Sequence, residues 1–302
     1  MGLRTATVDF ERVSVYQRTL DYVELAKPRL VLMVLIVTMV GFYMGSSGVP
    51  AWGQLLHLLL GIALAAGGSL ALNAYMERDT DALMPRTQSR PLPEGRIQPL
   101  AALRFGLIAT MAGLLYLTCF VQPLSAVVTA AITGSYLFCY TPLKLKTWLC
   151  SLVGAVPGAL PPVAGWVAAR GSFGPEALVL FLMLFLWQLP HSLAIARLYR
   201  DDYARAGFRI LPVVDDDGHS TGRQVVGYCL VLLVVGVLPT FLGMAGPVYG
   251  VLAFLLGAMF LGFGIHLARS YTEGAARRLL HASLIYLPVT FLLMALDKLP
   301  HL

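Results

Sequence analysis

The most regular feature of the chain is a series of long apolar runs separated by short polar segments. A hydrocarbon core of about 30 Å needs roughly 20 residues of helix to cross it. Backbone in lipid must satisfy its own hydrogen bonds, and a continuous apolar run does so as a helix. The pattern predicts an all-α polytopic membrane protein with nine spans, at residues 30–47, 55–74, 100–119, 122–140, 148–168, 176–196, 224–243, 247–268 and 281–298.

The composition excludes the usual soluble classes. Of the 302 residues 58% are hydrophobic and only 13% are charged, about half the charge of an average soluble chain. Disordered, collagen-like and secreted disulfide-linked proteins are excluded as well. A net charge of +6 could indicate nucleic acid, but the basic residues fall between the apolar runs. We therefore expect membrane lipid around the protein and no nucleic-acid partner.

The positive charges also predict how the chain is oriented. Lysine and arginine remain on the cytoplasmic side of a membrane, and nine spans place 20 of the 22 on one side, with only Arg170 and Lys298 opposite. Eight or ten spans would destroy this partition. We predict a cytoplasmic N-terminus, an outer C-terminus and a place in the inner, cytoplasmic membrane. Residues 1–28 lack the apolar core of a signal peptide, so we expect a cytoplasmic segment followed by one membrane domain, 29–302.

The second span ends in a group of oxygen-bearing side chains. At about 100° per residue, Asn73, Glu77 and Asp81 share one helix face, whereas Asp79 lies on another. Such a face suits Mg²⁺, which takes oxygen ligands and keeps waters and phosphates. The arginines that follow, among them Arg86, suit an anion such as diphosphate. The alternative is a solvated, salt-bridged helix end, but a polar residue at the edge of a span favours function.

A second acidic group follows the sixth span. Asp202, together with Asp201, is a candidate for a second metal site on the same side of the membrane. If the helix continues through this segment, Tyr199 and Asp202 share a face with His191. His191 itself follows Pro190, whose missing N–H frees a backbone carbonyl. The histidine is therefore either a core residue bonded to that carbonyl or, as a buried ionisable group, a functional ligand.

Several further strings complete a recognisable set over nearly the whole chain. With the two acidic groups they resemble the UbiA-type intramembrane prenyltransferases, and the double proline and the Trp-Gln-x-Pro-His string favour the haem-modifying branch. The strings that carry the resemblance are Tyr22–Arg29, Asn73–Asp81, Arg90–Arg96, Tyr140–Lys144, Gly158–Trp166, Trp187–His191, Asp201–Gly207 and Leu211–Val214.

The resemblance implies an architecture and a reaction. Nine helices would surround a central cavity that opens sideways to lipid, with a Mg²⁺-bound diphosphate at its cytoplasmic mouth. Farnesyl diphosphate and haem b would be the substrates, and haem A synthase or terminal-oxidase assembly proteins the partners. This chain departs from the family at two positions, where Glu77 replaces a usual aspartate and Cys150 replaces a common asparagine. A longer side chain at Glu77 puts direct metal binding in doubt.

The spacing and chemistry of the residues, together with the resemblance, give a set of expected roles, of which the resemblance itself implies those of Asn73, Asp81, Asp201 and Asp202 at the metal sites. Asp81 and Asp202 are expected to be catalytic, and His191 is the candidate haem ligand. The expected metal ligands are Asn73, Glu77, Asp81, Asp201 and Asp202. The expected diphosphate-binding residues are Arg78, Arg86, Arg90, Lys144, Arg197 and Arg200. The expected cavity walls are Tyr75, Tyr140, Trp166, Trp187 and Tyr199.

Two other functions fit parts of the pattern. A related transferase that acts on a quinone-ring precursor such as 4-hydroxybenzoate would carry the same acidic groups, and haem binding would separate the two. A secondary transporter also has many spans, but transporters place ionisable groups near the membrane midplane. Here the acids gather at one interface, which favours the transferase.

Overall fold

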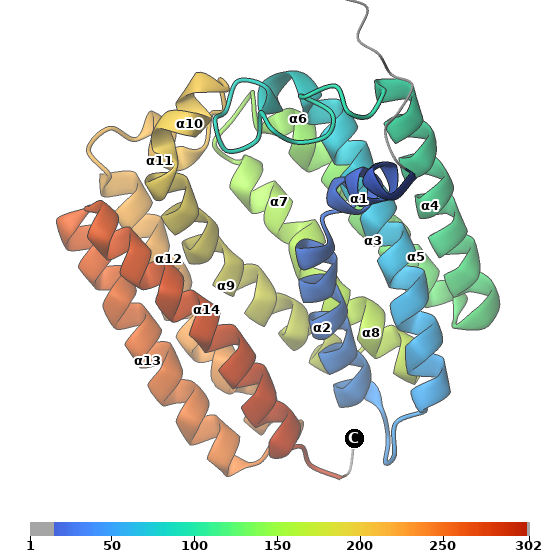
Figure 1. Ribbon diagram of the computed structural model, residues 1–302. Helices are drawn as coiled ribbons and strands as arrows, with labels where there is room; N and C mark the ends of the chain where they lie inside the picture. Colours follow the sequence, from blue (N-terminus) through green and yellow to red (C-terminus); the bar gives the residue numbers. More distant parts are fainter. Residues whose placement is uncertain (1–14, 301–302) are drawn as a thin grey trace, which may run out of the picture.

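The computed structural model describes residues 15–300, and within them nine helices are long and apolar enough to cross a membrane (Figure 1). This confirms the all-α, nine-span prediction. The spans are Pro28–Gly45, Trp52–Asp81, Pro99–Phe120, Pro123–Leu143, Cys150–Arg170, Pro175–Leu198, His219–Phe241, Pro247–Ser270 and Glu273–Leu296. Residues 1–14 of the predicted N-terminal segment lie outside the described part.

Two of the spans are assembled from shorter pieces. The elements are α1 (Val15–Leu25), α2 (Pro28–Gly45), α3 (Trp52–Asp81), α4 (Pro99–Phe120), α5 (Pro123–Gly134), η2 (Ser135–Tyr140), α6 (Thr141–Leu143), α7 (Cys150–Ala159), α8 (Pro161–Arg170), α9 (Pro175–Leu198), α10 (Arg200–Arg205), α11 (Leu211–Val214), α12 (His219–Phe241), α13 (Pro247–Ser270) and α14 (Glu273–Leu296). The fourth span therefore comprises α5, η2 and α6, and the fifth comprises α7 and α8.

Proline determines where many of these helices begin. Pro28, Pro99, Pro123, Pro175 and Pro247 each start a span, a position where the missing N–H costs no hydrogen bond and the fixed φ angle suits a helix. These starts agree closely with the apolar runs. The seventh and ninth spans begin earlier than predicted, at His219 and Glu273, because their charged first turns continue the helix beyond the apolar run.

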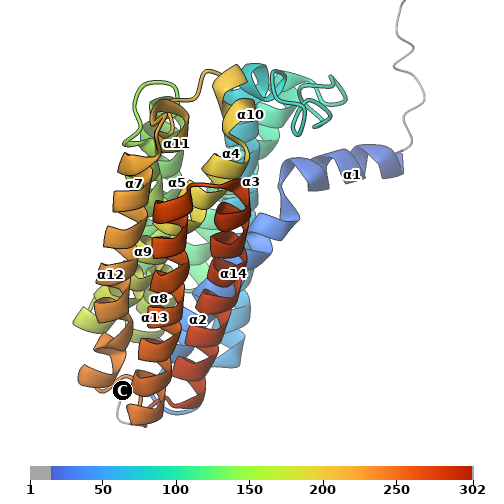
Figure 2. The ribbon, with the colours of Figure 1, turned by 90° about the vertical axis from the view of Figure 1, so that its left-hand side faces the viewer.

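One end of the bundle, which we call the loop end, collects the long connections. The end of α3, the loop of residues 82–98, α10 and α11 all lie there, at the top of Figure 1. Helix α1 lies at the same end and extends sideways from the bundle (Figure 2). The sequence analysis did not predict α1. Its acidic residues Asp21 and Glu24 accept hydrogen bonds from Arg96 of the 82–98 loop, which ties the helix to the bundle.

Irregular backbone in the middle spans brings helices close together. The fourth span contains the π-helix Ser135–Tyr140, and the fifth breaks at Leu160 before two consecutive prolines. There α8 packs directly on the backbone of α2. A Cβ atom added at Gly41 would lie 1.9 Å from the Pro162 carbonyl oxygen, and one at Gly165 would lie 2.0 Å from that of Thr38. Only glycine permits this approach.

At the opposite end of the bundle, residues 297–299 join the first span to the last three. The Lys298 Nζ atom donates to the carbonyl oxygens of Tyr43 and Ser46, each at 2.6 Å, and so satisfies the end of α2. The Asp297 carboxylate accepts from the Tyr249 backbone N–H at 2.7 Å, near the start of α13. The end of the ninth span therefore caps two other helices.

Candidate active site

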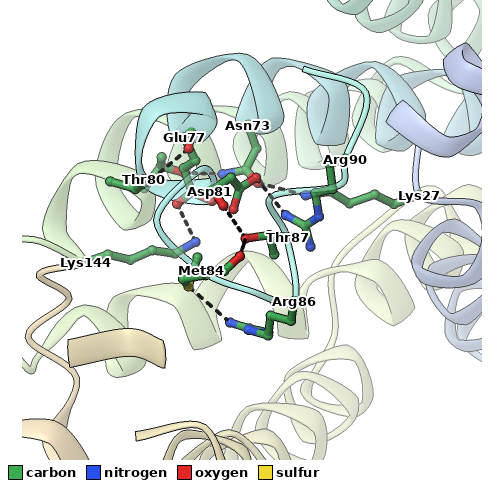
Figure 3. Close-up of polar contacts among 11 residues, drawn as sticks. Lys27, Asn73, Glu77, Thr80, Asp81, Met84, Arg86, Thr87, Arg90 and Lys144 are labelled. Carbon is green, nitrogen blue, oxygen red and sulfur yellow. Dashed lines mark hydrogen bonds and ion pairs between the residues drawn. The ribbon is translucent and has the colours of Figure 1, made fainter. Parts of the chain in front are cut away.

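The end of α3 gathers three polar side chains on one face, as their spacing predicts (Figure 3). Asn73 and Asp81 are buried, with exposed fractions of 1% and 3%. The Glu77 side chain is 11% exposed, whereas that of Asp79 is 83% exposed. The helix continues to Asp81, so the four-residue spacing stacks these groups one turn apart. Burial of two carboxylates here is costly unless each has a partner.

A separate cation faces each member of this stack. The Arg90 Nη1 atom lies 2.8 Å from Asp81 Oδ2, and the Lys144 Nζ atom lies 2.6 Å from Glu77 Oε1. Burial opposes the charged form of Lys144, but the electrostatic contributions of Tyr140 and Glu77 outweigh it and raise the pKa of Lys144. Both carboxylates are thus neutralised by cations that can also face an anion.

Lys27 completes the stack, and the sequence analysis gave it no role. Its Nζ atom lies 3.2 Å from Asn73 Oδ1, and the Asn73 amide donates to Thr141 Oγ1 at 3.1 Å. Burial, and then the charge of Arg90, lower the pKa of Lys27 to about 8, so the side chain still carries its proton at neutral pH. The available signal was a lysine directly before Pro28, at the edge of the first span.

The 82–98 loop connects the two acidic groups. Thr87 holds the loop against α3, because its hydroxyl donates to the Asp81 carbonyl oxygen at 2.6 Å. Arg86 then reaches across to α10, where its Nε atom lies 3.9 Å from Asp202 Oδ2. Its guanidinium also covers the rings of Tyr199 and Tyr203, at 5.2 and 4.6 Å. The two acidic helix ends therefore lie at the same end of the bundle, with Arg86 between them.

The sixth span does not continue as the regular helix that the sequence analysis assumed. Helix α9 ends at Leu198, and Tyr199 has φ −112° and ψ 29° before α10 begins at Arg200. Asp201 and Asp202 occupy the first turn of α10, where acidic side chains stabilise a helix start. The shared face of His191, Tyr199 and Asp202 was predicted for an unbroken helix, and this condition is not met. Asp202 is 18% exposed in its side chain and faces Arg86 and Arg205, whereas Asp201 is exposed.

The six predicted diphosphate-binding residues divide into two groups. Arg90 and Lys144 contact the end of α3, and Arg86 lies between that end and α10 (Figure 3). The other three bind elsewhere. Arg78 pairs with Asp79 and covers Tyr75, Arg197 donates to the Tyr271 carbonyl oxygen, and Arg200 pairs with Asp216 at 2.6 Å.

The predicted wall residues are spread along the bundle. Tyr140 lies beside the α3 cluster, with the Lys144 Nζ atom 4.5 Å from its ring centroid. Trp187 stacks on His191 between α9 and α14. Trp166 is buried on α8 beneath Arg170, near the opposite end of that span. Only Tyr140 and Tyr199 thus contact the cations of the candidate site.

A pocket adjoins Asp81 on the side of α1. Its volume is about 590 Å³, and its charged lining residues include Lys27, Asp81 and Arg90. The rest of its lining is mainly apolar, from α1, the start of α2 and residues 91–93 of the loop. Such a pocket can receive an anionic group at one end and apolar chain at the other.

The oxygen donors at the end of α3 fit a hard divalent cation. Within residues 15–300 no three His, Cys, Asp or Glu side chains are close enough together to hold a metal ion. Mg²⁺ commonly takes only one or two carboxylates from the protein and completes its coordination with water and phosphate oxygens. The stacked Asn73, Glu77 and Asp81 oxygens therefore match such an ion in number and chemistry.

Comparisons with known proteins identify the family of this chain. Residues 34–287 match the model of the UbiA prenyltransferase family. The protoheme IX farnesyltransferase of Solibacter usitatus (strain Ellin6076) is 45% identical over 287 residues, covering 92% of this chain and 98% of the relative. Among solved structures, a digeranylgeranylglyceryl phosphate synthase has a TM-score of 0.79 at 16% identity, covering 93% of this chain and 98% of its own.

A second solved structure shares the same fold and carries ligands. It is a UbiA homologue from Archaeoglobus fulgidus bound to GPP and Mg²⁺, with a TM-score of 0.65 at 16% identity, covering 91% of this chain and 99% of its own. The family match extends over most of the chain, and so does the similarity to the Solibacter enzyme. The chain therefore belongs to the UbiA prenyltransferase family.

Proposed function

We propose that this protein transfers the farnesyl group of farnesyl diphosphate to a vinyl group of haem b, with addition of water, to give haem O and diphosphate. The observation that carries the proposal is the buried stack at the end of α3, where Asp81 and Glu77 each face a cation beside a pocket with an apolar wall. The name of the 45% identical relative supports haem as the acceptor.

The diphosphate group is expected to bind between the α3 stack and α10. Lys27, Arg86, Arg90 and Lys144 bring four positive charges to this region. Asn73, Glu77 and Asp81 would hold one Mg²⁺ ion, and Asp202 with Asp201 a second. When bound, these ions would supply positive charge that stabilises the diphosphate as a leaving group.

The chain's own residues then determine the course of the reaction. The allylic carbon–oxygen bond breaks, and the diphosphate leaves with the electron pair toward Arg86, Arg90 and Lys144. The haem vinyl group forms the new carbon–carbon bond with the farnesyl carbon. Water captures the cation that remains beside the pyrrole and loses a proton, which gives a hydroxyethylfarnesyl group. Aromatic side chains such as Tyr140 would keep water away until that step.

Haem is expected to meet the protein at His191. This residue lies in the sixth span, on α9, seven residues before the helix ends at Leu198. An imidazole nitrogen is a common axial ligand of haem iron. We place the enzyme in the inner membrane with its loop end toward the cytoplasm, the side that carries 20 of the 22 lysines and arginines. Its partners there would be haem A synthase or terminal-oxidase assembly proteins.

The direct test is to replace Asp81 by asparagine in protein purified in detergent. With farnesyl diphosphate, haem b and Mg²⁺, we expect Asp81→Asn to lower the rate of haem O formation roughly 100-fold or more, the usual effect of losing one preorganised electrostatic group. Mass spectrometry measures the product. Asp79→Asn is the matched control, because Asp79 lies on the same helix with its side chain in solvent.

Two results would contradict the proposal. If the Asp81→Asn variant forms haem O at the wild-type rate, Asp81 has no role in the reaction. Wild-type protein that prenylates 4-hydroxybenzoate and leaves haem b unchanged would identify a different acceptor.

A further inference from the structure

Three side chains form a polar cluster between α9 and α14, within the membrane-spanning part of both helices. The His191 Nδ1 atom lies 2.7 Å from Ser283 Oγ. The Trp187 indole N–H donates to the Ser283 carbonyl oxygen at 2.8 Å. Both residues of α9 are thus attached to a single residue of α14, once through its hydroxyl and once through its backbone.

The hydrogen bonds of Ser283 determine which nitrogen of His191 carries the proton. Ser283 Oγ also lies 2.6 Å from the Leu280 carbonyl oxygen, which can only accept. The single hydroxyl proton of Ser283 is therefore used in that bond. Towards His191 the hydroxyl oxygen must accept, so the proton of the neutral imidazole lies on Nδ1. A doubly protonated imidazolium within a membrane span would be costly.

The other ring nitrogen, Nε2, consequently presents a lone pair. Within residues 15–300 this nitrogen has no hydrogen-bond partner. The enclosed side-chain atoms without partners in that part of the chain are the hydroxyls of Thr110, Tyr286 and Thr290. Because Nε2 is not among them, the protein does not fully enclose it, and its lone pair is left for a ligand.

Trp187 fixes the orientation of the imidazole plane. The two rings stack with centroids 4.9 Å apart and planes 21° from parallel. The indole is in turn held by its hydrogen bond to Ser283. The imidazole can therefore neither flip nor rotate without breaking a bond to Ser283 or losing the stack, and its free lone pair points in one fixed direction.

We propose that Ser283 is a positioning residue, which fixes His191 in the Nδ1–H form so that Nε2 binds the iron of the haem substrate. The proposal rests on the proposed function, since it needs haem as the acceptor. Histidine ligands of metals generally donate their second N–H to an oxygen that sets the tautomer and the ring orientation. Here that oxygen is the hydroxyl of Ser283, on the last span. Iron ligation would fix the centre of the macrocycle relative to α9.

The test compares haem b with metal-free protoporphyrin IX, which has the same vinyl groups and no iron. We expect the wild-type protein to bind haem more tightly than protoporphyrin IX and to shift the Soret band of haem. His191→Ala should remove both the preference and the shift. Ser283→Ala should weaken haem binding about 10- to 100-fold, the usual effect of losing the hydrogen-bond partner of a metal ligand, and should leave protoporphyrin IX binding unchanged.

Two variants serve as controls. Ser283→Thr keeps a hydroxyl and should preserve the preference for haem. Ser192→Ala removes a serine hydroxyl next to His191 that bonds only to its own helix, at 2.6 Å from the Gln188 carbonyl oxygen, and should have no effect. Retained protoporphyrin IX binding shows that each variant is folded.

The outcomes separate this inference from the proposed function. If His191→Ala or Ser283→Ala keeps the wild-type Soret band and haem affinity while haem O still forms, the positioning role is overturned and the farnesyl transfer stands. If wild-type protein neither binds haem nor forms haem O, both are overturned.

Discussion

The ammonium group of Lys27 joins parts of the chain that are far apart in sequence. Lys27 has a φ angle of +52°, rare for a residue other than glycine, and this conformation turns α1 sideways from α2. The side chain then reaches Asn73, and through it Thr141. Residues held in such a backbone conformation are found preferentially at functional sites, which agrees with a position beside the diphosphate.

A substitution at Lys27 tests this position. We expect Lys27→Met to raise the KM for farnesyl diphosphate about tenfold or more, because a hydrogen bond from a charged group contributes roughly 1.5–3 kcal/mol, and to change kcat less. Steady-state kinetics in detergent measure both. Arg18→Met removes an exposed positive charge on α1 that does not line the pocket and should leave KM unchanged. Equal KM values for the two variants would place Lys27 outside the binding site.

Single residues also show which contacts of the candidate site could be predicted from the sequence. Asn73, Glu77 and Asp81 were found because their contact depends only on local helix geometry. Lys27 and Thr141 were not, because their contacts with Asn73 depend on how three spans pack. The same limit explains why Arg78, Arg197 and Arg200 were grouped with Arg90: composition near a span end does not tell which way a long side chain points.

Helix α12 shows how a short loop segment stabilises the start of a span. The Asp215 carboxylate accepts hydrogen bonds from the backbone N–H and the hydroxyl of Thr221, both at 2.6 Å. Burial would raise the pKa of Asp215, but the bonds from Thr221 and Ser220 outweigh it and hold the pKa below its usual value of 3.8. The carboxylate form therefore stabilises the first turn of α12.

The pH dependence follows from the direction of this shift. Above pH 3.8 Asp215 is ionised in both the folded and the unfolded chain, and its stabilisation is complete. It is lost as the pH falls through the lower pKa of the folded state. We expect Asp215→Asn to lower the free energy of unfolding by about 1 kcal/mol at pH 7, and the difference from wild type to vanish at acid pH. Thermal unfolding in detergent measures it.

The matched control for this prediction is Asp216→Asn, since the Asp216 side chain is 93% exposed and pairs with Arg200 at the surface. Exposed ion pairs contribute little, so its stability should stay close to that of wild type. A destabilisation of Asp215→Asn that does not diminish as the pH falls below 3.8 would contradict the role of the carboxylate.

At the scale of elements, the apolar runs predicted the spans but not their irregularities. The π-helix Ser135–Tyr140 and the break of the sixth span at Tyr199 do not appear in the apolar pattern, which marks the length of a span and not its local geometry. The sequence did contain signals for two other irregular points. The consecutive prolines Pro161 and Pro162 mark the break in the fifth span, and the acidic pair Asp201 and Asp202 is typical of a helix start. Helix α1 was missed because its 11 residues are too short for a span.

For the whole molecule, the odd number of spans and the distribution of basic residues predict an orientation that labelling can test. We expect Ser172→Cys, in the turn between α8 and α9, to react with a membrane-impermeant maleimide in intact cells. Asp217→Cys, before α12, should react only after the cells are opened. The exposed Cys119 and Cys139 are first replaced by alanine. The reverse pattern would place the loop end outside.

The hydrogen bonds of Lys298 can form only late in the synthesis of the bundle. The carbonyl groups that end the first span, those of Tyr43 and Ser46, receive their donor from a residue about 250 positions later in the chain. During synthesis these carbonyl groups therefore lack this donor until the ninth span has been made. The link between the first span and the end of the ninth thus forms late, and a chain that stops before Lys298 would lack it.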